Sequence, residues 1–261
     1  MHDTCSTTRF EEGLRIRELV NQSRARRDQS ITGSGHSLAM TAATADMSPL
    51  ALRAHEQGGL EGIRNLRKLD DRLAKDSELQ DFMAQMSGVH GRIVDAQGLQ
   101  VAVIADAQHL KAAEAYALEA VEPTIHSTPG KLWRPGAIRE HRHEAWITNT
   151  QVNFCARAYQ TVPSSHSDAP ALTVLSAVLR NGYLHRAIRE QGGAYGGGAS
   201  HDGNIGAFRF FSYRDPRLGE TLADFDAAID WFLASKHESE TLEEAILGVI
   251  GSLDKPGSPA G

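Results

Sequence analysis

Residues 189–198 read REQGGAYGGG, so five glycines fall within seven positions around one alanine and one tyrosine. An apolar run of helical character precedes this stretch, and the aromatic segment NIGAFRFFSY (204–213), which is typical of a strand, follows it. A glycine-rich stretch in this position predicts a helix C-terminus and a sharp turn. We therefore expect a mixed α/β unit here, in which Tyr195 is the one large side chain that the turn presents.

The glycine-rich stretch does not match the phosphate-binding motifs. A P-loop requires lysine and then serine or threonine after its last glycine, whereas Gly197 is followed by Gly198 and Ala199. The spaced glycine triplet of the dinucleotide fingerprint cannot be placed on these glycines either. A helix that leads into the stretch also reverses the order that puts a phosphate at a helix N-terminus. These features argue against a stand-alone phosphate-binding α/β domain.

The composition excludes several classes of function. The 261 residues are 41% hydrophobic, which suffices for a packed core, and 27 basic against 33 acidic residues give a net charge of -6. This charge predicts no nucleic-acid partner. No run approaches the roughly 20 apolar residues of a membrane span, and the N-terminus has no signal peptide. We therefore expect no membrane partner and a soluble protein, for which the cytoplasm is the default compartment although the sequence names none.

Residues 1–121 are predicted to form a first unit in which helices alternate with short strands. The clearest helix covers Leu60–Leu73, because apolar residues recur there every three or four positions with charged residues between them. Strands are expected at LAMTAATADMS (38–48) and at QVAVIAD (100–106). Further helices are expected from Phe10 to about Asp28, from Ser77 to Val89, and in an alanine-rich segment to about Val121.

Residues 122–145 hold three prolines and two glycines without any hydrophobic period, which predicts an interdomain linker. A second unit, 146–261, opens with a segment typical of one long strand, AWITNTQVNFCARAYQTV (145–162). Asp168, followed by a proline, is the expected N-cap of a helix that runs towards Arg189. After the strand at 204–213, we expect a helix around Leu222–Phe232 and another with a capping-box spacing at Thr241 and Glu244.

The 12 histidines raise the question of a metal site. A zinc peptidase needs two histidines and a glutamate on one helical face, as in H-E-x-x-H or the inverted H-x-x-E-H, and neither motif is present. The nearest segment is HRHEA (141–145), where alanine takes the last ligand position after His141 and His143. It lies in the predicted linker, so we expect no metal site in this chain. Cys5 and Cys155 make neither a disulfide framework nor a four-thiolate site.

Three segments carry the most specific motifs of the sequence. They are TGSGHSLAMTAA (32–43), residues 145–162, and LRNGYLHRAIREQGGAYGGGASHDGNIGAFRFFSYRDPRLGETLADFDAAIDWF (179–232), in which the pattern RxxGGAYG precedes SYRDP. On these residues the chain resembles the C-terminal half of the pitrilysin/insulysin family of zinc metallopeptidases, in its presequence-protease-like branch. The resemblance runs over most of the chain, and the missing zinc motif is its main departure.

The resemblance implies a mixed α/β (α+β) fold in which mixed sheets pack against helices, as in the metallopeptidase and mitochondrial-processing-peptidase-like fold. It implies a larger protein of two similar halves that close round a chamber for unfolded peptides. Residues 1–121 would then be the end of a third domain, 122–145 a linker, and 146–261 the first, truncated part of a fourth domain. The zinc site belongs to the N-terminal half. The implied partners are that half and an unfolded peptide, and no cofactor is expected in this chain.

The resemblance also implies a role for the glycine-rich stretch. In the family an arginine and a tyrosine of this part reach the substrate, and the matching residues here are Arg189 and Tyr195. Both suit a peptide carbonyl or its oxyanion, because arginine stays charged and a phenol donates a hydrogen bond, and neither suits general base work. The backbone around them would let an extended peptide come close. Substrate binding is therefore expected at Gly192, Gly193, Ala194, Gly196 and Gly197.

The expected function is substrate binding and carbonyl or oxyanion stabilisation within a zinc metalloendopeptidase. Whether the chain counts as an enzyme stays open, since without a zinc motif it is expected to be inactive alone. The alternative is a non-catalytic family member, in which the same fold acts as a binding or scaffolding subunit. An inverted zinc motif upstream of Met1 would distinguish the two.

Overall fold

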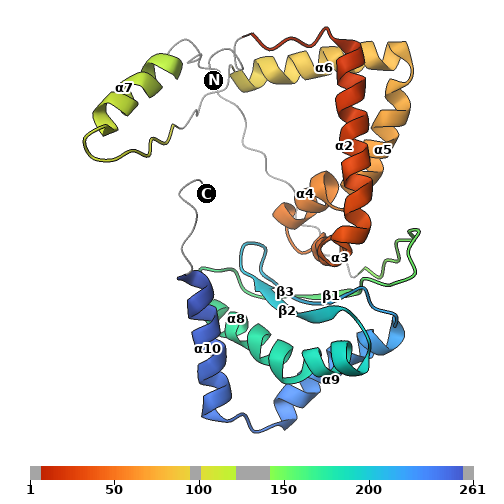
Figure 1. Cartoon of the computed structure of the whole chain (residues 1–261), viewed down its shortest axis with the longest axis vertical. Helices are drawn as coiled ribbons and strands as arrows, with labels where there is room; N and C mark the ends of the chain where they lie inside the picture. The colour runs from red at the N-terminus through yellow and green to blue at the C-terminus, as the bar shows by residue number, and fades with distance from the viewer. Residues whose placement is uncertain (1–6, 95–100, 122–141, 255–261) are drawn as a thin grey trace. The chain divides into compact units, whose positions relative to one another are not determined.

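The computed structural model describes residues 7–94, 101–121 and 142–254 (Figure 1). Contacts within the chain divide it into two compact units, Met1–Ala25 with Leu66–Arg134 and Arg26–Asn65 with Pro135–Gly261. Of the predicted linker, only residues 142–145 lie within the described part. The assignment of residues 1–121 and 146–261 to two domains of a larger protein stays a prediction.

The described elements of the first unit are helices. They are α2 (Gly13–Gly33), α5 (Leu60–Leu73), α6 (Asp76–Val94) and α7 (Leu110–Val121), of which α2 and α5 also contribute residues to the second unit. Arg24 of α2 pairs with Asp70 at 2.9 Å and with Asp71 at 2.8 Å on the charged side of α5. The helices predicted from the Leu60–Leu73 periodicity, from residues 77–89 and before Val121 are confirmed.

Both strands predicted for residues 1–121 are wrong. The segment LAMTAATADMS lies mainly in α3 (Gly35–Thr44). Its alanine, leucine and methionine favour a helix only weakly, and packing on the sheet of the second unit decides for it. α4 (Pro49–Gly58) follows, with the Ser48 hydroxyl accepting from the Ala51 N–H as an N-cap. Residues 101–106 form neither helix nor strand, and Gln100 lies outside the described residues. An apolar run becomes a strand where a neighbouring strand takes its backbone hydrogen bonds, and no described strand does so here.

The second unit is built on a three-stranded antiparallel sheet in the order β1-β3-β2. The strands are β1 (Ala156–Gln160), β2 (Gly196–Asp202) and β3 (Ala207–Tyr213). This sheet confirms the strand predicted at 204–213 and the mixed fold. The strand predicted for 145–162 is shorter than expected. Among the described residues of this segment outside β1, only Asn153 forms a β-bridge, and its partner is Asp215, just after β3.

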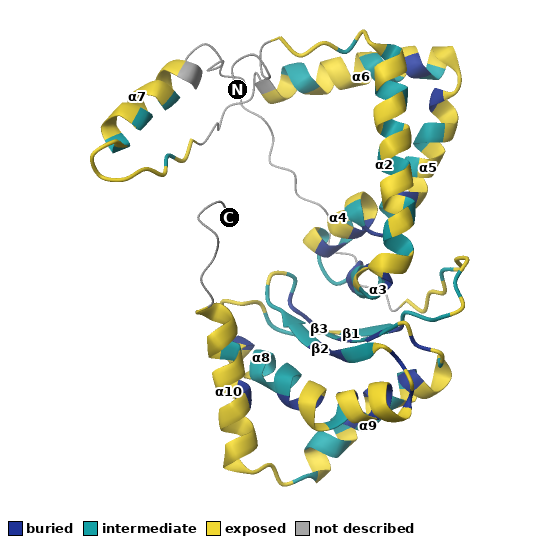
Figure 2. Cartoon of the chain, viewed as in Figure 1, coloured by how far each residue is buried: buried dark blue, intermediate teal, exposed yellow. Residues whose placement is uncertain are grey.

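Helices cover both faces of this sheet (Figure 1). Side chains of β3 alternate between the faces, so Phe208 and Phe210 are buried on one of them, where Phe210 meets Phe225 of α9 (Gly219–Ala234) at 5.6 Å between ring centroids. Phe211 and Tyr213 face α3 instead, through ring contacts with His36. Buried residues accordingly gather between the sheet and its flanking helices, as the dark blue in Figure 2 shows.

One long helical segment leads to the glycine-rich turn. α8 (Ala169–Leu179) continues directly into a π-helical segment, η2 (Arg180–Gln191), so the predicted helix is confirmed. Asp168 stands at the N-cap position, yet its side chain makes no capping hydrogen bond, because its backbone is helical (φ -87°, ψ -7°) rather than extended. The capping box predicted at Thr241 and Glu244 is wrong, since the N-cap of α10 (Ser239–Leu253) is Glu238, three residues before Thr241.

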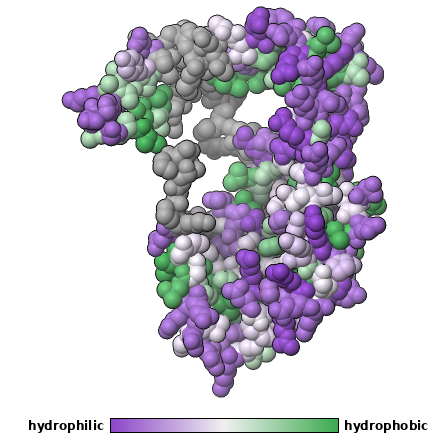
Figure 3. Space-filling model, in the orientation of Figure 1, coloured by the Kyte–Doolittle hydropathy of each residue, from purple (hydrophilic) through white to green (hydrophobic). Residues whose placement is uncertain are grey.

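Part of α10 stays uncovered by the described residues. Figure 3 shows apolar surface, in green, over this helix. Its exposed apolar side chains are Leu242, Ile246, Leu247, Ile250 and Leu253. None of the helices in the described ranges is both long enough and apolar enough to span a lipid bilayer.

Candidate functional site

Two backbone hydrogen bonds close the end of η2. The Gly193 N–H donates to the Arg189 carbonyl and the Ala194 N–H to the Ile188 carbonyl, both at 3.1 Å. Gly193 has a φ of +77°, a left-handed conformation that glycine adopts without strain. The predicted helix C-terminus and sharp turn are therefore confirmed, and Arg189 and Tyr195 lie on either side of the turn.

The glycines after the turn do not form the flexible loop that their number suggests. Gly196, Gly197 and Gly198 open β2 and pair with β3. A Cβ atom on Gly197 would lie 2.8 Å from Ile188 Cγ2 and one on Gly198 would lie 3.2 Å from Arg180 Cγ, whereas Gly196 faces open space. Gly197 and Gly198 therefore let η2 pack directly on the strand, and this packing fixes the position of the turn.

Tyr195 is presented to solvent by this turn. The residue is 69% exposed, and its hydroxyl has no hydrogen-bond partner among the described residues. Its N–H donates to the carbonyls of Tyr213 at 3.0 Å and Arg214 at 3.4 Å. Its ring stands edge-on to Tyr213, with 5.5 Å between the centroids. The backbone of Tyr195 is thus held by the sheet, while its phenolic donor is available to a ligand.

Arg189 lies in the last turn of η2 and is exposed. Within the part of the chain that the structure describes, its guanidinium makes no hydrogen bond or ion pair. The fold therefore brings Arg189 and Tyr195 to one turn, each with unused donors. That the two side chains meet at one ligand atom stays a prediction.

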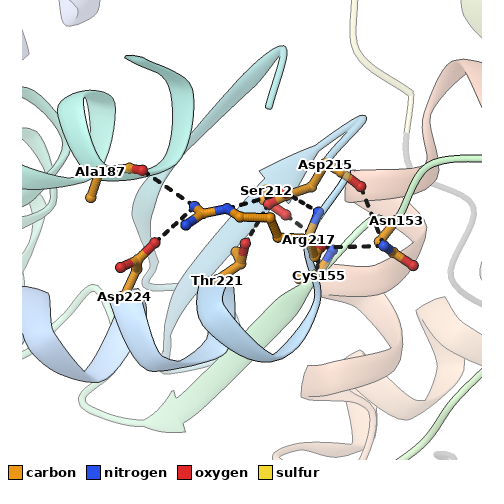
Figure 4. A network of polar contacts seen from close by, with 8 residues as sticks. All are labelled: Asn153, Cys155, Ala187, Ser212, Asp215, Arg217, Thr221 and Asp224. Carbon is orange, nitrogen blue, oxygen red and sulfur yellow. Dashed lines mark hydrogen bonds and ion pairs between the residues drawn. The ribbon is translucent and has the colours of Figure 1, made fainter. Parts of the chain in front are cut away.

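Arg217 links the end of η2 to α9 and so supports the glycine-rich turn, in the network of Figure 4. Its Nη2 donates to the Ala187 carbonyl in η2 at 3.2 Å and to Asp224 Oδ2 in α9 at 2.8 Å. Gly192 leaves the space for this guanidinium, since a Cβ there would lie 2.0 Å from Arg217 Nη2. A charge-assisted bond of this kind is about twice as strong as a neutral one, so Arg217 ties the end of η2 firmly to α9.

Asp215 anchors Arg217 in turn. Its side chain is fully buried, with Oδ2 accepting from the Thr221 hydroxyl at 2.7 Å and Oδ1 accepting from the Arg217 N–H at 2.9 Å. Its backbone exchanges two hydrogen bonds with Asn153, at 2.7 and 2.9 Å. Hydrogen bonds to Thr221, Arg217 and Asn153 therefore fix the segment after β3, and the glycine-rich turn packs against this segment.

The SYRDP motif carries part of the resemblance, but its Asp215 and the following Arg217 had no predicted role. The signal was present, because two opposite charges on either side of a proline follow a strand directly. Their partners, Ala187 and Asp224, come from other elements and could not be named from local pattern.

An aromatic cluster supports Tyr213 on the α3 side of the sheet. His36 lies 4.8 Å and Phe154 lies 5.8 Å from the Tyr213 ring, between centroids. Burial lowers the pKa of His36, and its Nδ1 is buried without a hydrogen-bond partner. His36 is therefore neutral at neutral pH and acts by packing, so it helps to hold the ring against which Tyr195 rests.

The described residues do not fit a zinc ion. They contain no group of three or more His, Cys, Asp or Glu side chains that could hold a metal. His143 is exposed, and His141 lies outside the described residues. No residue of the glycine-rich turn is a metal ligand type, apart from the exposed Glu190.

We expect the isolated chain to bind no stoichiometric zinc, since neither peptidase motif occurs in the sequence and the described residues form no ligand cluster. Metal analysis after chelation and zinc re-addition checks this, with His143→Ala as the comparison. One tightly bound zinc per chain would contradict the prediction, and its loss in His143→Ala would identify His143 as a ligand.

Comparison with known proteins gives two family matches. A model described as "PreP C-terminal domain" matches residues 143–261, and one described as associated with peptidases of family M16, subfamily C, matches residues 1–69. The mitochondrial presequence protease of Danio rerio is 29% identical over 99% of this chain, and that of Yarrowia lipolytica is 30% identical over 95%. Presequence protease 1 of Arabidopsis thaliana, chloroplastic/mitochondrial, is 28% identical over 94%. The chain covers 27%, 25% and 22% of these three relatives, respectively.

Two matches of this kind, together with the helix, glycine turn and sheet described above, indicate the class: residues 1–69 and 143–261 are similar to domains of M16 peptidases. Within that class, the chain is similar to a C-terminal segment of presequence proteases. The resemblance drawn from RxxGGAYG and SYRDP is confirmed.

The expected cytoplasmic location is wrong by this comparison. The relatives are named as mitochondrial proteins or, in the plant, as chloroplastic and mitochondrial. The expectation rested on the missing signal peptide in this sequence, and a segment that spans about a quarter of its relatives does not carry that information.

Proposed function

We propose that this chain supplies substrate binding and carbonyl or oxyanion stabilisation to a zinc metalloendopeptidase that degrades unfolded peptides in a closed chamber. The observation that carries the proposal is the pair of unused donors, the Arg189 guanidinium and the Tyr195 hydroxyl, on one fixed turn. Similarity to domains of M16 peptidases supports it, and the presequence-protease relatives support peptides as the substrate class.

The chemistry follows from where charge develops. When a nucleophile attacks a peptide carbonyl, the carbonyl oxygen becomes negative, and donors already held in place stabilise that charge without reorganisation. Arg189 would supply a permanent positive charge and forked N–H donors, and Tyr195 one O–H donor. Neither removes a proton from water at neutral pH, so this chain would bind and stabilise but would not supply the base.

The proposed substrate contacts divide into two kinds. Gly193 is exposed and Gly196 faces open space, so an extended peptide could approach the backbone there. Gly192 and Gly197 abut Arg217 and Ile188 instead. Their missing side chains serve packing, and any effect on substrate would be indirect. Ala194 is buried and would likewise act through the turn.

In this proposal residues 1–121 and 146–261 are parts of a third and a fourth peptidase-like domain, joined by residues 122–145. The N-terminal half of the protein would hold the zinc, with the base and the attacking water. Since the described residues of this chain do not fit zinc, we assign no step of the reaction to a metal here.

Replacing Arg189 by alanine in the complete peptidase is expected to lower the turnover of an unfolded peptide by about 10²-fold, because one donor to the oxyanion is lost. Arg189→Lys should also impair turnover, since it keeps the charge but not the planar fork. The free energy of unfolding should change by less than about 0.5 kcal/mol, because the side chain is exposed and unpaired among the described residues.

Arg186→Ala is the matched control, since Arg186 is exposed in the same π-helical segment. It should leave turnover and stability unchanged. Equal turnover in Arg186→Ala and Arg189→Ala would remove the catalytic assignment and favour a binding or scaffolding subunit.

A further inference from the structure

We propose that Arg214 and the hollow beside Tyr213 bind a carboxylate group of the peptide substrate. The inference rests on the proposed peptidase function and adds a substrate preference to it. The hollow has a volume of about 300 Å³. Its lining residues, all from the second compact unit, are Thr32, Thr150, Gln151, Val152, Phe154 and Arg214.

The hollow borders the candidate site directly. Tyr195 donates its N–H to the carbonyls of both Tyr213 and Arg214, and its ring touches that of Tyr213. Phe154 packs on the same Tyr213 ring, at 5.8 Å between centroids. A group held in the hollow would therefore lie next to a peptide held at Tyr195.

The backbone of Arg214 is unusual for its residue type. It has a φ of 49°, and it is the one non-glycine residue with positive φ in the part of the chain that the structure describes. This conformation is strained for a residue with a Cβ, and glycine or asparagine would adopt it more easily. Ala156 lies opposite Phe211 but Asn153 lies opposite Asp215, so the stretch that contains Arg214 has one extra residue, a bulge, and bulges redirect side chains next to functional sites. An arginine kept in such a position indicates a use for its side chain.

The guanidinium of Arg214 has no ion pair or hydrogen bond among the described residues and lies 5.6 Å from the centroid of the Tyr213 ring. The arginines that precede and follow it in the sequence both form ion pairs. Arg209 meets Asp202 at 3.1 Å, and Arg217 meets Asp224 at 2.8 Å. The free charge at the hollow is thus a local feature of Arg214.

The lining suits an anionic group, of which the carboxylate is the one that an unmodified peptide carries. Arg214 is the one charged residue in it, and a guanidinium binds a carboxylate with two parallel hydrogen bonds. The Thr150 hydroxyl accepts from the Val152 N–H at 3.4 Å, which leaves its own proton to donate. Phe154 and Val152 form an apolar wall for a short aliphatic stem. The carboxylate would come from an aspartate or glutamate side chain or from the C-terminus of a peptide.

The test uses the complete peptidase and two pairs of fluorogenic peptides. One pair differs by glutamate against glutamine, scanned over the positions next to the cleaved bond, and the other by a free C-terminus against an amide. We expect the carboxylate peptide of one pair to have a KM lower by about fivefold, the upper end of the scale for an exposed ion pair. Which pair responds identifies the source of the carboxylate.

Arg214→Asn and Arg214→Gly remove the guanidinium while tolerating the left-handed backbone, so both should fold and both should abolish the difference within the pair. Arg186→Ala should retain it. No difference in the unaltered protein, or a difference that survives both Arg214 variants, would overturn the inference. Should no peptide be cleaved at all, the proposed function fails. Fluorescence anisotropy with the same pairs would then still decide whether Arg214 selects carboxylates.

Discussion

Replacing Tyr195 by phenylalanine is expected to lower peptide turnover in the complete peptidase by roughly 10²–10³-fold, the range for losing one hydrogen bond to an oxyanion. The substitution removes one hydroxyl group, which has no partner among the described residues, and it keeps the ring that stands edge-on to Tyr213. The backbone bonds to Tyr213 and Arg214 are also kept. Stability should therefore be nearly unchanged, and the loss should lie mainly in kcat, since the oxygen is most negative in the transition state.

Tyr116→Phe provides the control, because Tyr116 of α7 is 73% exposed and loses the same hydroxyl. Turnover and melting temperature measured together separate the possible roles. A lower melting temperature with unchanged turnover would mean that Tyr195 serves the fold. Unchanged values of both would leave the residue without the function that we propose.

The sequence predicted best what is local. The Leu60–Leu73 period forms α5 because its apolar stripe repeats at helical spacing, and NIGAFRFFSY forms β3 because alternate aromatic residues face the core. The helix, glycine turn and strand around Tyr195 were also predictable, since Gly193 supplies a conformation that ends a helix. Arg189 and Tyr195 as a pair came from resemblance, not from local pattern.

The predictions that failed concern residues whose structure depends on partners far away in the sequence. Residues 38–48 could have been strand or helix by hydrophobicity, and packing of α3 on the sheet decides for the helix. Gly197 and Gly198 look like a loop, but they are small because Ile188 and Arg180 of η2 lie against them. Arg214 is the arginine of the SYRDP motif, but nothing in the local sequence predicts its backbone conformation. Its left-handed backbone lies where the chain has one extra residue against the segment from Asn153 to Ala156.

Among the polar residues discussed, we expect Asp215 to contribute most to the stability of the fold. Asp215→Ala should lower the free energy of unfolding by about 3 kcal/mol, because the buried Thr221 hydroxyl and the Arg217 N–H each lose their acceptor, at roughly 1–3 kcal/mol each. Asp215→Asn keeps one oxygen and the shape, so about 1 kcal/mol is expected for it. Urea denaturation of the isolated chain, followed by tryptophan fluorescence, measures both.

Asp230→Ala removes the same charge from an exposed position, so its comparison with Asp215→Ala separates the effect of burial from that of charge. Asp230 is an exposed carboxylate of α9, so its loss should change the free energy of unfolding by less than about 0.5 kcal/mol. If Asp215→Ala costs no more than Asp230→Ala, the network of Figure 4 does not stabilise the fold. If it costs the expected amount, the turn should be affected too, because Arg217, which Asp215 holds, fills the space at Gly192 and ties Ala187 to Asp224. Asp215→Asn in the complete peptidase should then lower turnover without altering any group that touches substrate, through a less firmly held Tyr195.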